Sequence, residues 1–205
     1  MYDVYTGFKW IAEVMRRNEG KKQYIGGGEE SYGFLCQDFV RDKDAVSACC
    51  ILAEMTAWAK DKGWSLYQLL QQIYLEYGYS KEVNISVVKK GKSGAEEIQQ
   101  MMKNFRINPP QQLGGSRICV WKDYQTLEET HDDGSKHKLE MPDTSNVLQW
   151  FCEDGTKVSV RPSGTEPKIK FYLEIKDKMN SPVDYTECEK RAEQKIEKIK
   201  KDLGV

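Results

Sequence analysis

The feature that most constrains the fold of this chain is a short polar loop enclosed by two segments with strand-like alternation. The loop spans Arg161–Pro167, and its flanks, Lys157–Val160 and Lys168–Ile175, alternate polar and apolar side chains. Alternation with a period of two is typical of half-buried β-strands. The sequence therefore predicts two strands, with the loop held as a rigid tip between them.

The loop carries the groups that a phosphate dianion needs. Arg161 offers a planar fork of donors, Ser163 and Thr165 offer hydroxyls, and Gly164 lets backbone N–H groups turn inward. These four residues are the candidate phosphate ligands. The alternative is a hairpin connection in which Pro162 and Gly164 serve only the turn geometry and the hydroxyls bond to local backbone.

Length and composition describe a globular protein of one or two domains. The chain has 205 residues, of which 39% are hydrophobic and 31% are charged, and these values are typical of a soluble protein. No apolar run approaches the length of a membrane span, and the start lacks the basic and apolar regions of a secretion signal. We therefore expect a cytoplasmic protein.

Charge and cysteine content argue against several kinds of partner. The 31 basic and 32 acidic residues leave a net charge of −1, which gives no general field for nucleic acid or for an acidic membrane. We expect neither as a partner, so any bound anion must be held locally. The six cysteines form no CxxC pair and most have apolar neighbours, which favours reduced structural thiols over a metal site or disulfides.

The chain begins with a glycine turn that leads into a helix. Ile11, Val14 and Met15 follow helical spacing. Lys9 falls in the first turn, where the helix dipole disfavours a cation, and taken alone it is a solvated lysine whose stem covers Trp10. No leading strand precedes this helix, so the chain reads as if it enters a domain partway through.

A glycine-rich loop follows, between short strands predicted at residues 23–25 and 34–36. It spans Gly26–Gly33 and begins with three glycines, followed by two carboxylates and a hydroxyl. Glu29 and Ser31 suit sugar hydroxyls, which both donate and accept hydrogen bonds. Metal binding and glycoside hydrolysis are disfavoured because adjacent acids point in different directions. The alternative is a plain glycine-rich turn with solvated acids.

Two strong helices are predicted next, each with an apolar stripe. The first runs from the acidic start at Asp42–Asp44 to Gly63, and the second runs from a capping box at Ser65 to Gly78. We interpret both stripes as core rather than as cofactor-binding surfaces. The expected inward residues are Ala45, Cys49, Leu52, Met55 and Ala59 in the first helix, and Leu66, Leu69, Leu70, Ile73 and Tyr77 in the second.

The pattern changes at residues 79–82, which we interpret as a linker or a domain boundary. A strand is predicted at residues 83–87, a helix from Ser93 to about residue 107, strands at 117–124, 147–153 and 156–160, and a final helix at 182–203. The expected inward residues are Ile98, Met101, Met102 and Phe105 in the first of these helices, and Cys188, Ala192, Ile196, Ile199 and Leu203 in the second.

These elements predict a first domain that the chain enters partway through, followed by an α+β domain. In the second domain, residues 81–205 form an antiparallel sheet with two helices packed on one face. Between the strands, His131, Asp132, Asp133 and His137 suggest a metal site. We reject that interpretation because Asp-Gly is a turn signal and the segment has the polarity of a surface hairpin.

Four motifs occur in the order seen in the alpha-D-phosphohexomutases. They are Tyr5–Lys9 (YTGFK), Gly28–Gly33 (GEESYG), Phe39–Asp44 (FVRDKD) and the loop Arg161–Pro167 (RPSGTEP). The chain most resembles the longer phosphoglucomutase/phosphomannomutase branch, which includes phosphopentomutase-like members. The resemblance covers essentially the whole chain, but only the C-terminal part of that family's four-domain enzyme. It implies that residues 1–80 are the C-terminal part of a truncated α/β third domain and that residues 81–205 are the C-terminal, phosphate-binding α+β domain.

The resemblance implies a role for each candidate residue. Glu29 and Ser31 would grip sugar hydroxyls from the third domain, and Lys9 would lie by the reacting groups as a candidate for charge stabilisation or proton shuttling. The fourth-domain loop would bind the phosphate that is not transferred, through Arg161, Ser163, Gly164 and Thr165.

The resemblance also implies a reaction and its partners. Such enzymes interconvert sugar 1-phosphates and 6-phosphates through a bisphosphorylated sugar and a phosphoserine, with Mg2+ and a glucose 1,6-bisphosphate-type activator. The expected ligands are glucose or mannose 1-phosphate or 6-phosphate, or a pentose phosphate, and the residues do not discriminate among them. The expected protein partner is the missing N-terminal domains of the same polypeptide.

The chain departs from the family in what it lacks. It contains no serine-histidine-asparagine loop of the phosphoserine type and no Asp-x-Asp-x-Asp-Arg metal loop, both of which lie in earlier domains of the family. We therefore expect a mutase fragment that is inactive by itself and provides no metal site. The alternative is a stand-alone, non-catalytic phosphosugar-binding or regulatory module, and the gene sequence upstream of Met1 would discriminate the two.

Overall fold

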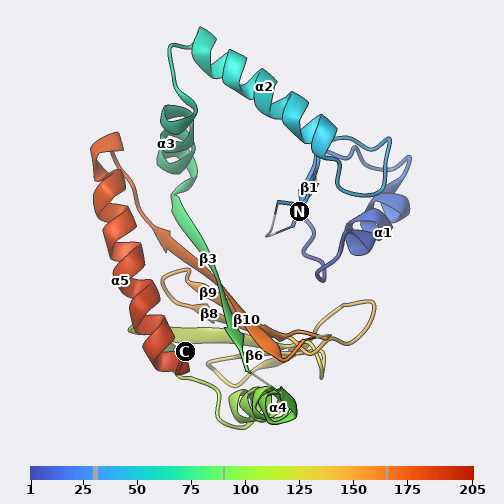
Figure 1. Ribbon diagram of the computed structural model, residues 1–205, viewed down its shortest axis with the longest axis vertical. Helices are drawn as coiled ribbons and strands as arrows, with labels where there is room; N and C mark the ends of the chain where they lie inside the picture. Colours follow the sequence, from blue (N-terminus) through green and yellow to red (C-terminus); the bar gives the residue numbers. More distant parts are fainter. Residues whose placement is uncertain (30–31, 90, 165) are drawn as a thin grey trace. The chain divides into compact units, whose positions relative to one another are not determined.

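The chain folds into two compact units, residues 1–70 and 71–205 (Figure 1). The computed structural model describes residues 1–29, 32–89, 91–164 and 166–205, without the side chain of Lys92. In this described part, every helix is too short or too polar to cross a lipid bilayer.

The first unit is built around a small apolar cluster. Helix α1 (Phe8–Asn18) contributes Phe8 and Met15, and these pack with Leu35. Leu35 belongs to a two-stranded antiparallel ribbon of β1 (Gly27–Gly28) and β2 (Phe34–Leu35). The helix and the second strand were predicted from the sequence, and both are confirmed.

The strand predicted at residues 23–25 is wrong, because the ribbon pairs two residues further along, at Gly27 and Gly28. Tyr24 is attached to β2 by its side chain instead of by a backbone ladder. Its hydroxyl donates to the carbonyl oxygen of Leu35 at 2.9 Å, and its ring packs against the apolar cluster. A short apolar run in a sequence does not show whether the segment is attached to its neighbour by backbone hydrogen bonds or by a side chain.

Helices α2 (Ala45–Asp61) and α3 (Leu66–Tyr77) begin at the predicted caps. The Asp44 carboxylate accepts hydrogen bonds from the N–H groups of Val46 and Ser47, both at 3.1 Å, as an N-cap does. The capping box of α3 is also confirmed. Gln68 N–H donates to Ser65 Oγ at 3.2 Å, and Ser65 N–H donates to Gln68 Oε1 at 2.8 Å.

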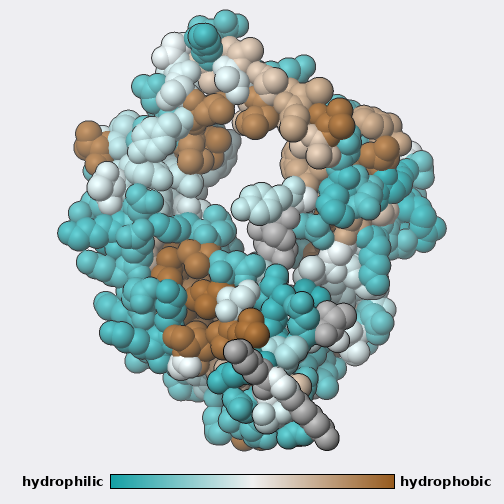
Figure 2. Space-filling model, in the orientation of Figure 1, coloured by the Kyte–Doolittle hydropathy of each residue, from teal (hydrophilic) through white to brown (hydrophobic). Residues whose placement is uncertain are grey.

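The predicted core stripes of α2 and α3 are wrong for most of their residues, although Ala59 is buried and Leu69 is half-buried. Leu52 and Met55 are 53% and 41% exposed, and Ala59 is the buried residue of α2; apolar side chains along this helix are visible in Figure 2. In α3 the packed face holds Gln71, Tyr74 and Leu75. Periodicity identifies a helix with an apolar face, but it does not show whether another element covers that face. The predicted residues that are exposed are Ala45, Cys49, Leu52, Met55, Leu66, Leu70, Ile73 and Tyr77.

The second unit is an antiparallel sheet. Its strand order is β3-β10-β9-β8-β5-β6-β7, and β4 pairs with β5, so the described residues form an eight-stranded sheet. The strands are β3 (Tyr79–Val88), β4 (Gln112–Leu113), β5 (Ser116–Asp123), β6 (Glu128–His131), β7 (Lys136–Lys138), β8 (Leu148–Cys152), β9 (Lys157–Pro162) and β10 (Lys168–Asp177).

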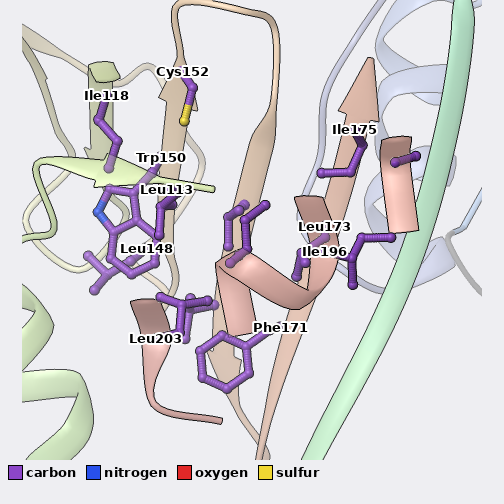
Figure 3. Close-up of a cluster of buried hydrophobic side chains, with 14 of the residues drawn as sticks. Leu113, Ile118, Leu148, Trp150, Cys152, Phe171, Leu173, Ile175, Ile196 and Leu203 are labelled. Atoms are coloured by element: carbon purple, nitrogen blue, oxygen red, sulfur yellow. The ribbon is translucent and has the colours of Figure 1, made fainter. Parts of the chain in front are cut away.

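Two helices cover one face of this sheet, as predicted. Helix α4 (Gly91–Ile107) contributes Ile98 and Met102 to the core. A 3-10 turn (Pro182–Asp184) leads into α5 (Tyr185–Leu203), whose five predicted inward residues are all buried. Figure 3 shows side chains of β8, β10 and α5 in one cluster, including Trp150, Phe171 and Ile196. Full burial of a side chain such as Phe171 contributes about 1.5–3 kcal/mol.

The linker interpretation of residues 79–82 is wrong, since these residues begin strand β3 and pair with residues 174–177 of β10. The Tyr79 ring is buried at 5.0 Å from the Tyr74 ring and 5.9 Å from the Tyr185 ring. Lys81 forms ion pairs with Glu189 and Glu193 of α5. Glycine and polar residues at this point of the sequence are typical of a linker, so this first part of the strand was not predicted. Aromatic and ionic contacts with residues of α3 and α5 hold it in place.

The six cysteines are free thiols in this structure. Cys152 and Cys188 are buried, whereas Cys49 and Cys50 are exposed. Burial raises the pKa of the Cys152 thiol to about 11, so this side chain stays protonated at neutral pH. Cys152 is therefore a core residue rather than a nucleophile.

Candidate functional site

The β9–β10 connection is shorter than the sequence suggested. Arg161 and Pro162 belong to β9, where they pair with Lys170 and Ile169 of β10, so the loop proper is 163–167. Val158 and Val160 face the core, and the strand alternation therefore puts Arg161 on the opposite face of the sheet from α4. The remaining candidates lie at the tip.

The described part of the loop is held by a short set of hydrogen bonds. Ser163 N–H donates to the carbonyl oxygen of Lys168 at 2.8 Å, and Lys168 N–H donates to that of Glu166 at 2.7 Å. Glu166 N–H donates to Ser163 Oγ at 3.3 Å. These bonds define the geometry of the tip, and its rigidity stays a prediction. Thr165 lies outside the described residues.

Two charged groups differ in their availability at this loop. Glu166 forms an ion pair with Lys168 at 2.6 Å, and the hydrogen bond from Lys168 lowers the pKa of the Glu166 carboxyl. Arg161 is half-buried and forms no ion pair with any residue that the structure describes. The ion pair with Lys168 reduces the repulsion between Glu166 and an incoming anion. The Arg161 guanidinium, which has no such partner among the described residues, can form an ion pair with a ligand.

The start of α4 lies against the same loop. A hollow of about 470 Å³ is lined by Gly91, Ala95 and Gln99 of α4 together with Ser163, Gly164 and Pro167 of the loop. Lys89, just before α4, donates its N–H to the Pro167 carbonyl oxygen at 2.9 Å. Sequence reasoning missed this junction, because no local pattern shows that residues 89–99 meet residues 163–167.

The sugar-loop candidates lie in the first unit. Glu29 is half-buried, and its N–H donates to the Gly33 carbonyl oxygen at 2.8 Å. A β-carbon added at Gly33 would lie 2.6 Å from Glu29 Oε2 and 3.2 Å from Lys43 Cδ. The glycine therefore leaves room for the Glu29 carboxylate beside Lys43. Ser31 lies outside the described residues.

Lys9 is exposed on the first turn of α1. Its Nζ lies 4.8 Å from the centre of the Trp10 ring, close enough for a cation–π contact. This is the arrangement expected of a lysine that covers Trp10. A role for Lys9 beside reacting groups stays a prediction.

The segment that contains His131 and His137 is a hairpin, as predicted when the metal-site interpretation was rejected. Strands β6 and β7 pair antiparallel, and residues 132–135 connect them. The rings of His131 and His137 meet edge to face at 5.3 Å, and His131 Nε2 lies 2.8 Å from Glu129 Oε1. Across the described ranges, no three His, Cys, Asp or Glu side chains come together as a metal site.

The structure thus groups the candidates by unit. Arg161, Ser163 and Gly164 lie together at the end of the β9–β10 hairpin, and Lys9 and Glu29 lie in the first unit. The hairpin end combines a guanidinium that forms no ion pair with a described residue, the backbone of Gly164 and the Ser163 hydroxyl, which accepts a hydrogen bond from Glu166 N–H. Such a set binds oxyanions.

Comparisons with known proteins cover both units. Residues 1–77 match the family model of the phosphoglucomutase/phosphomannomutase alpha/beta/alpha domain III. Residues 82–180 match that of the phosphoglucomutase/phosphomannomutase C-terminal domain.

Curated relatives are longer than this chain. It is 38% identical to a phosphoglucomutase of Staphylococcus aureus (strain N315) over 174 residues, which cover 85% of the chain and 31% of the relative. It is 34% identical to a phosphoglucomutase of Staphylococcus haemolyticus (strain JCSC1435), again over 174 residues, with 84% and 31% covered. The chain therefore spans about a third of the length of these relatives.

A solved structure shows the same fold. The open form of parafusin from Paramecium, an exocytosis-sensitive phosphoprotein described as a phosphoglucomutase, aligns with a TM-score of 0.56 at 17% identity. The alignment covers 98% of this chain and 34% of that one. The family models and the curated relatives show that the chain belongs to the phosphoglucomutase/phosphomannomutase family, with a domain III portion followed by the C-terminal domain.

Proposed function

We propose that this chain is the sugar-binding and phosphate-binding part of a cytoplasmic phosphohexose mutase that interconverts sugar 1-phosphates and 6-phosphates through a bisphosphorylated intermediate. The ligands are phosphates of glucose, mannose or a pentose. The boundary between the two parts lies near residue 80, between the stretches at 1–77 and 82–180 that match the two family models.

The observation that carries this proposal is the β9–β10 hairpin end. Its described backbone is fixed by hydrogen bonds, and Arg161 has no ionic partner among the described residues. A preorganised loop with an unpaired guanidinium binds a dianion with little loss of conformational entropy. In this role Arg161, Ser163, Gly164 and Thr165 hold the phosphate that is not transferred.

The first unit supplies the sugar contacts in this proposal. Glu29 and Ser31 bind hydroxyls of the sugar, and Lys9 stabilises charge or moves a proton near the reacting groups. Mg2+ and a glucose 1,6-bisphosphate-type activator belong to the proposal for a full-length enzyme only. The described residues form no cluster suited to a metal ion.

Titration of this chain with glucose 1-phosphate and glucose 6-phosphate, by calorimetry or NMR, tests the proposal. We expect weak binding through the loop, and Arg161→Ala should weaken it about 10- to 100-fold because a charge-assisted contact is lost. Lys157→Ala is the matched control, since Lys157 lies on the same face of β9 but away from the loop. Equal affinities of the wild type and Arg161→Ala would contradict the proposal.

A further inference from the structure

Gly94, in the first turns of α4, is packed against the backbone of Lys89. A β-carbon added at Gly94 would lie 2.6 Å from the carbonyl carbon of Lys89 and 2.8 Å from its carbonyl oxygen. Such separations are too short for van der Waals contact, and the atoms concerned belong to the main chain. A side chain at position 94 therefore requires either α4 or Lys89 to move.

Helix α4 is fixed against such a movement. Ile98 and Met102 are buried in the main core. Near the other end of the helix, Arg106 donates two hydrogen bonds to Asp123, at 2.8 and 3.2 Å, and one to Asn146 at 2.7 Å. The displacement would consequently fall on Lys89.

Lys89 is directly joined to the end of the candidate phosphate loop. Its N–H donates to the Pro167 carbonyl oxygen at 2.9 Å. The preceding residue, Val88, pairs with Lys168, whose own carbonyl oxygen accepts the hydrogen bond from Ser163. A shift of Lys89 therefore reaches both ends of the loop.

We propose that Gly94 is a positioning residue for the phosphate loop. By permitting close approach of α4 to Lys89, it holds the Lys89–Pro167 hydrogen bond and hence the geometry of Ser163 and Gly164. This inference takes only the identity of the ligand from the proposed function. The contacts of Gly94 with Lys89, and of Lys89 with Pro167, are independent of what the loop binds.

The test compares Gly94→Ala with Ser93→Ala in the full 205-residue chain, with inorganic phosphate and glucose 6-phosphate as the probes. We expect Gly94→Ala to weaken the binding of both probes about 3- to 10-fold, which is the effect of losing one neutral hydrogen bond or weakening two. The amide NMR signals of Ser163 and Gly164 should shift in this variant. Ser93 is exposed, and its replacement should leave both affinities and both signals unchanged.

Hydrogen exchange in the wild type provides a test that needs no variant. Saturating phosphate should slow exchange of the Lys89 amide, because a ligand on the loop stabilises the bond that holds it. The amide of Lys81, elsewhere on β3, serves as the reference and should not change.

The outcomes separate the two proposals. Unchanged loop signals and affinities in a folded Gly94→Ala, or no ligand effect on Lys89 exchange when phosphate binds, would overturn the positioning role. If phosphate does not bind the wild type at all but Gly94→Ala still shifts the Ser163 and Gly164 signals, the junction stands and the proposed function fails.

Discussion

At the scale of single residues, a missing β-carbon explains how the Glu29 carboxylate is accommodated. Glu29 Oε2 occupies space that any larger residue at position 33 would need, since an added β-carbon would lie 2.6 Å from it. The obstructing atom is at the end of a flexible side chain. Substitution should therefore displace the carboxylate rather than unfold the unit.

Gly33→Ala tests this view of the sugar loop. We expect the NMR signals of the Glu29 and Lys43 side chains to shift, while the free energy of unfolding falls by less than about 1 kcal/mol, as for most substitutions that meet only mobile atoms. Gly26→Ala is a control in the same loop, because its nearest neighbours would lie at 3.7 Å. A Glu29 signal that is unchanged in Gly33→Ala would contradict the assignment.

At the scale of elements, the sequence predicted which segments are helical better than it predicted what they pack against. In α5 the inward residues were right because Cys188, Ile196 and their neighbours face a sheet from the same unit. In α2 an equally clear pattern left Leu52 and Met55 exposed. The local spacing of residues shows that a helix has an apolar face. Whether another element packs on that face depends on residues far away in the sequence.

The ion pair of Arg106 with Asp123 joins helix α4 to strand β5. The side chains are 20% and 15% exposed, so Arg106→Met should lower the free energy of unfolding by about 1–3 kcal/mol, because it leaves a partly buried carboxylate without its cation. Urea denaturation measures this change. Arg16→Met removes an exposed pair with Glu13 and should change the free energy of unfolding far less, because solvent screens exposed ion pairs. Equal effects of the two substitutions would show that the Arg106–Asp123 pair adds nothing beyond an exposed one.

At the scale of the whole molecule, the candidate residues are distributed over two units. The motifs located Glu29 and Arg161 from the sequence, because glycine turns and alternating strands have local signals. The junction of Gly94, Lys89 and Pro167 could not be found this way. It depends on β3 pairing with β10, which brings together segments that lie more than 70 residues apart.

The chain alone is not expected to catalyse phosphoryl transfer. Phosphoryl transfer requires a positioned nucleophile and charge stabilisation, commonly by a metal ion. The 205 residues include neither the serine loop nor the acidic metal loop of the family. We therefore expect no conversion of glucose 1-phosphate to glucose 6-phosphate in the presence of Mg2+ and glucose 1,6-bisphosphate.

A coupled dehydrogenase assay measures this conversion, with the Staphylococcus aureus phosphoglucomutase as the positive control. Trace activity from a contaminating enzyme would be the same in the wild type and in Arg161→Ala. Turnover that is present in the wild type and lost in Arg161→Ala would instead belong to the chain itself. That result would show that its two units contain a complete catalytic site, contrary to the division of roles proposed for Lys9, Glu29 and the β9–β10 loop.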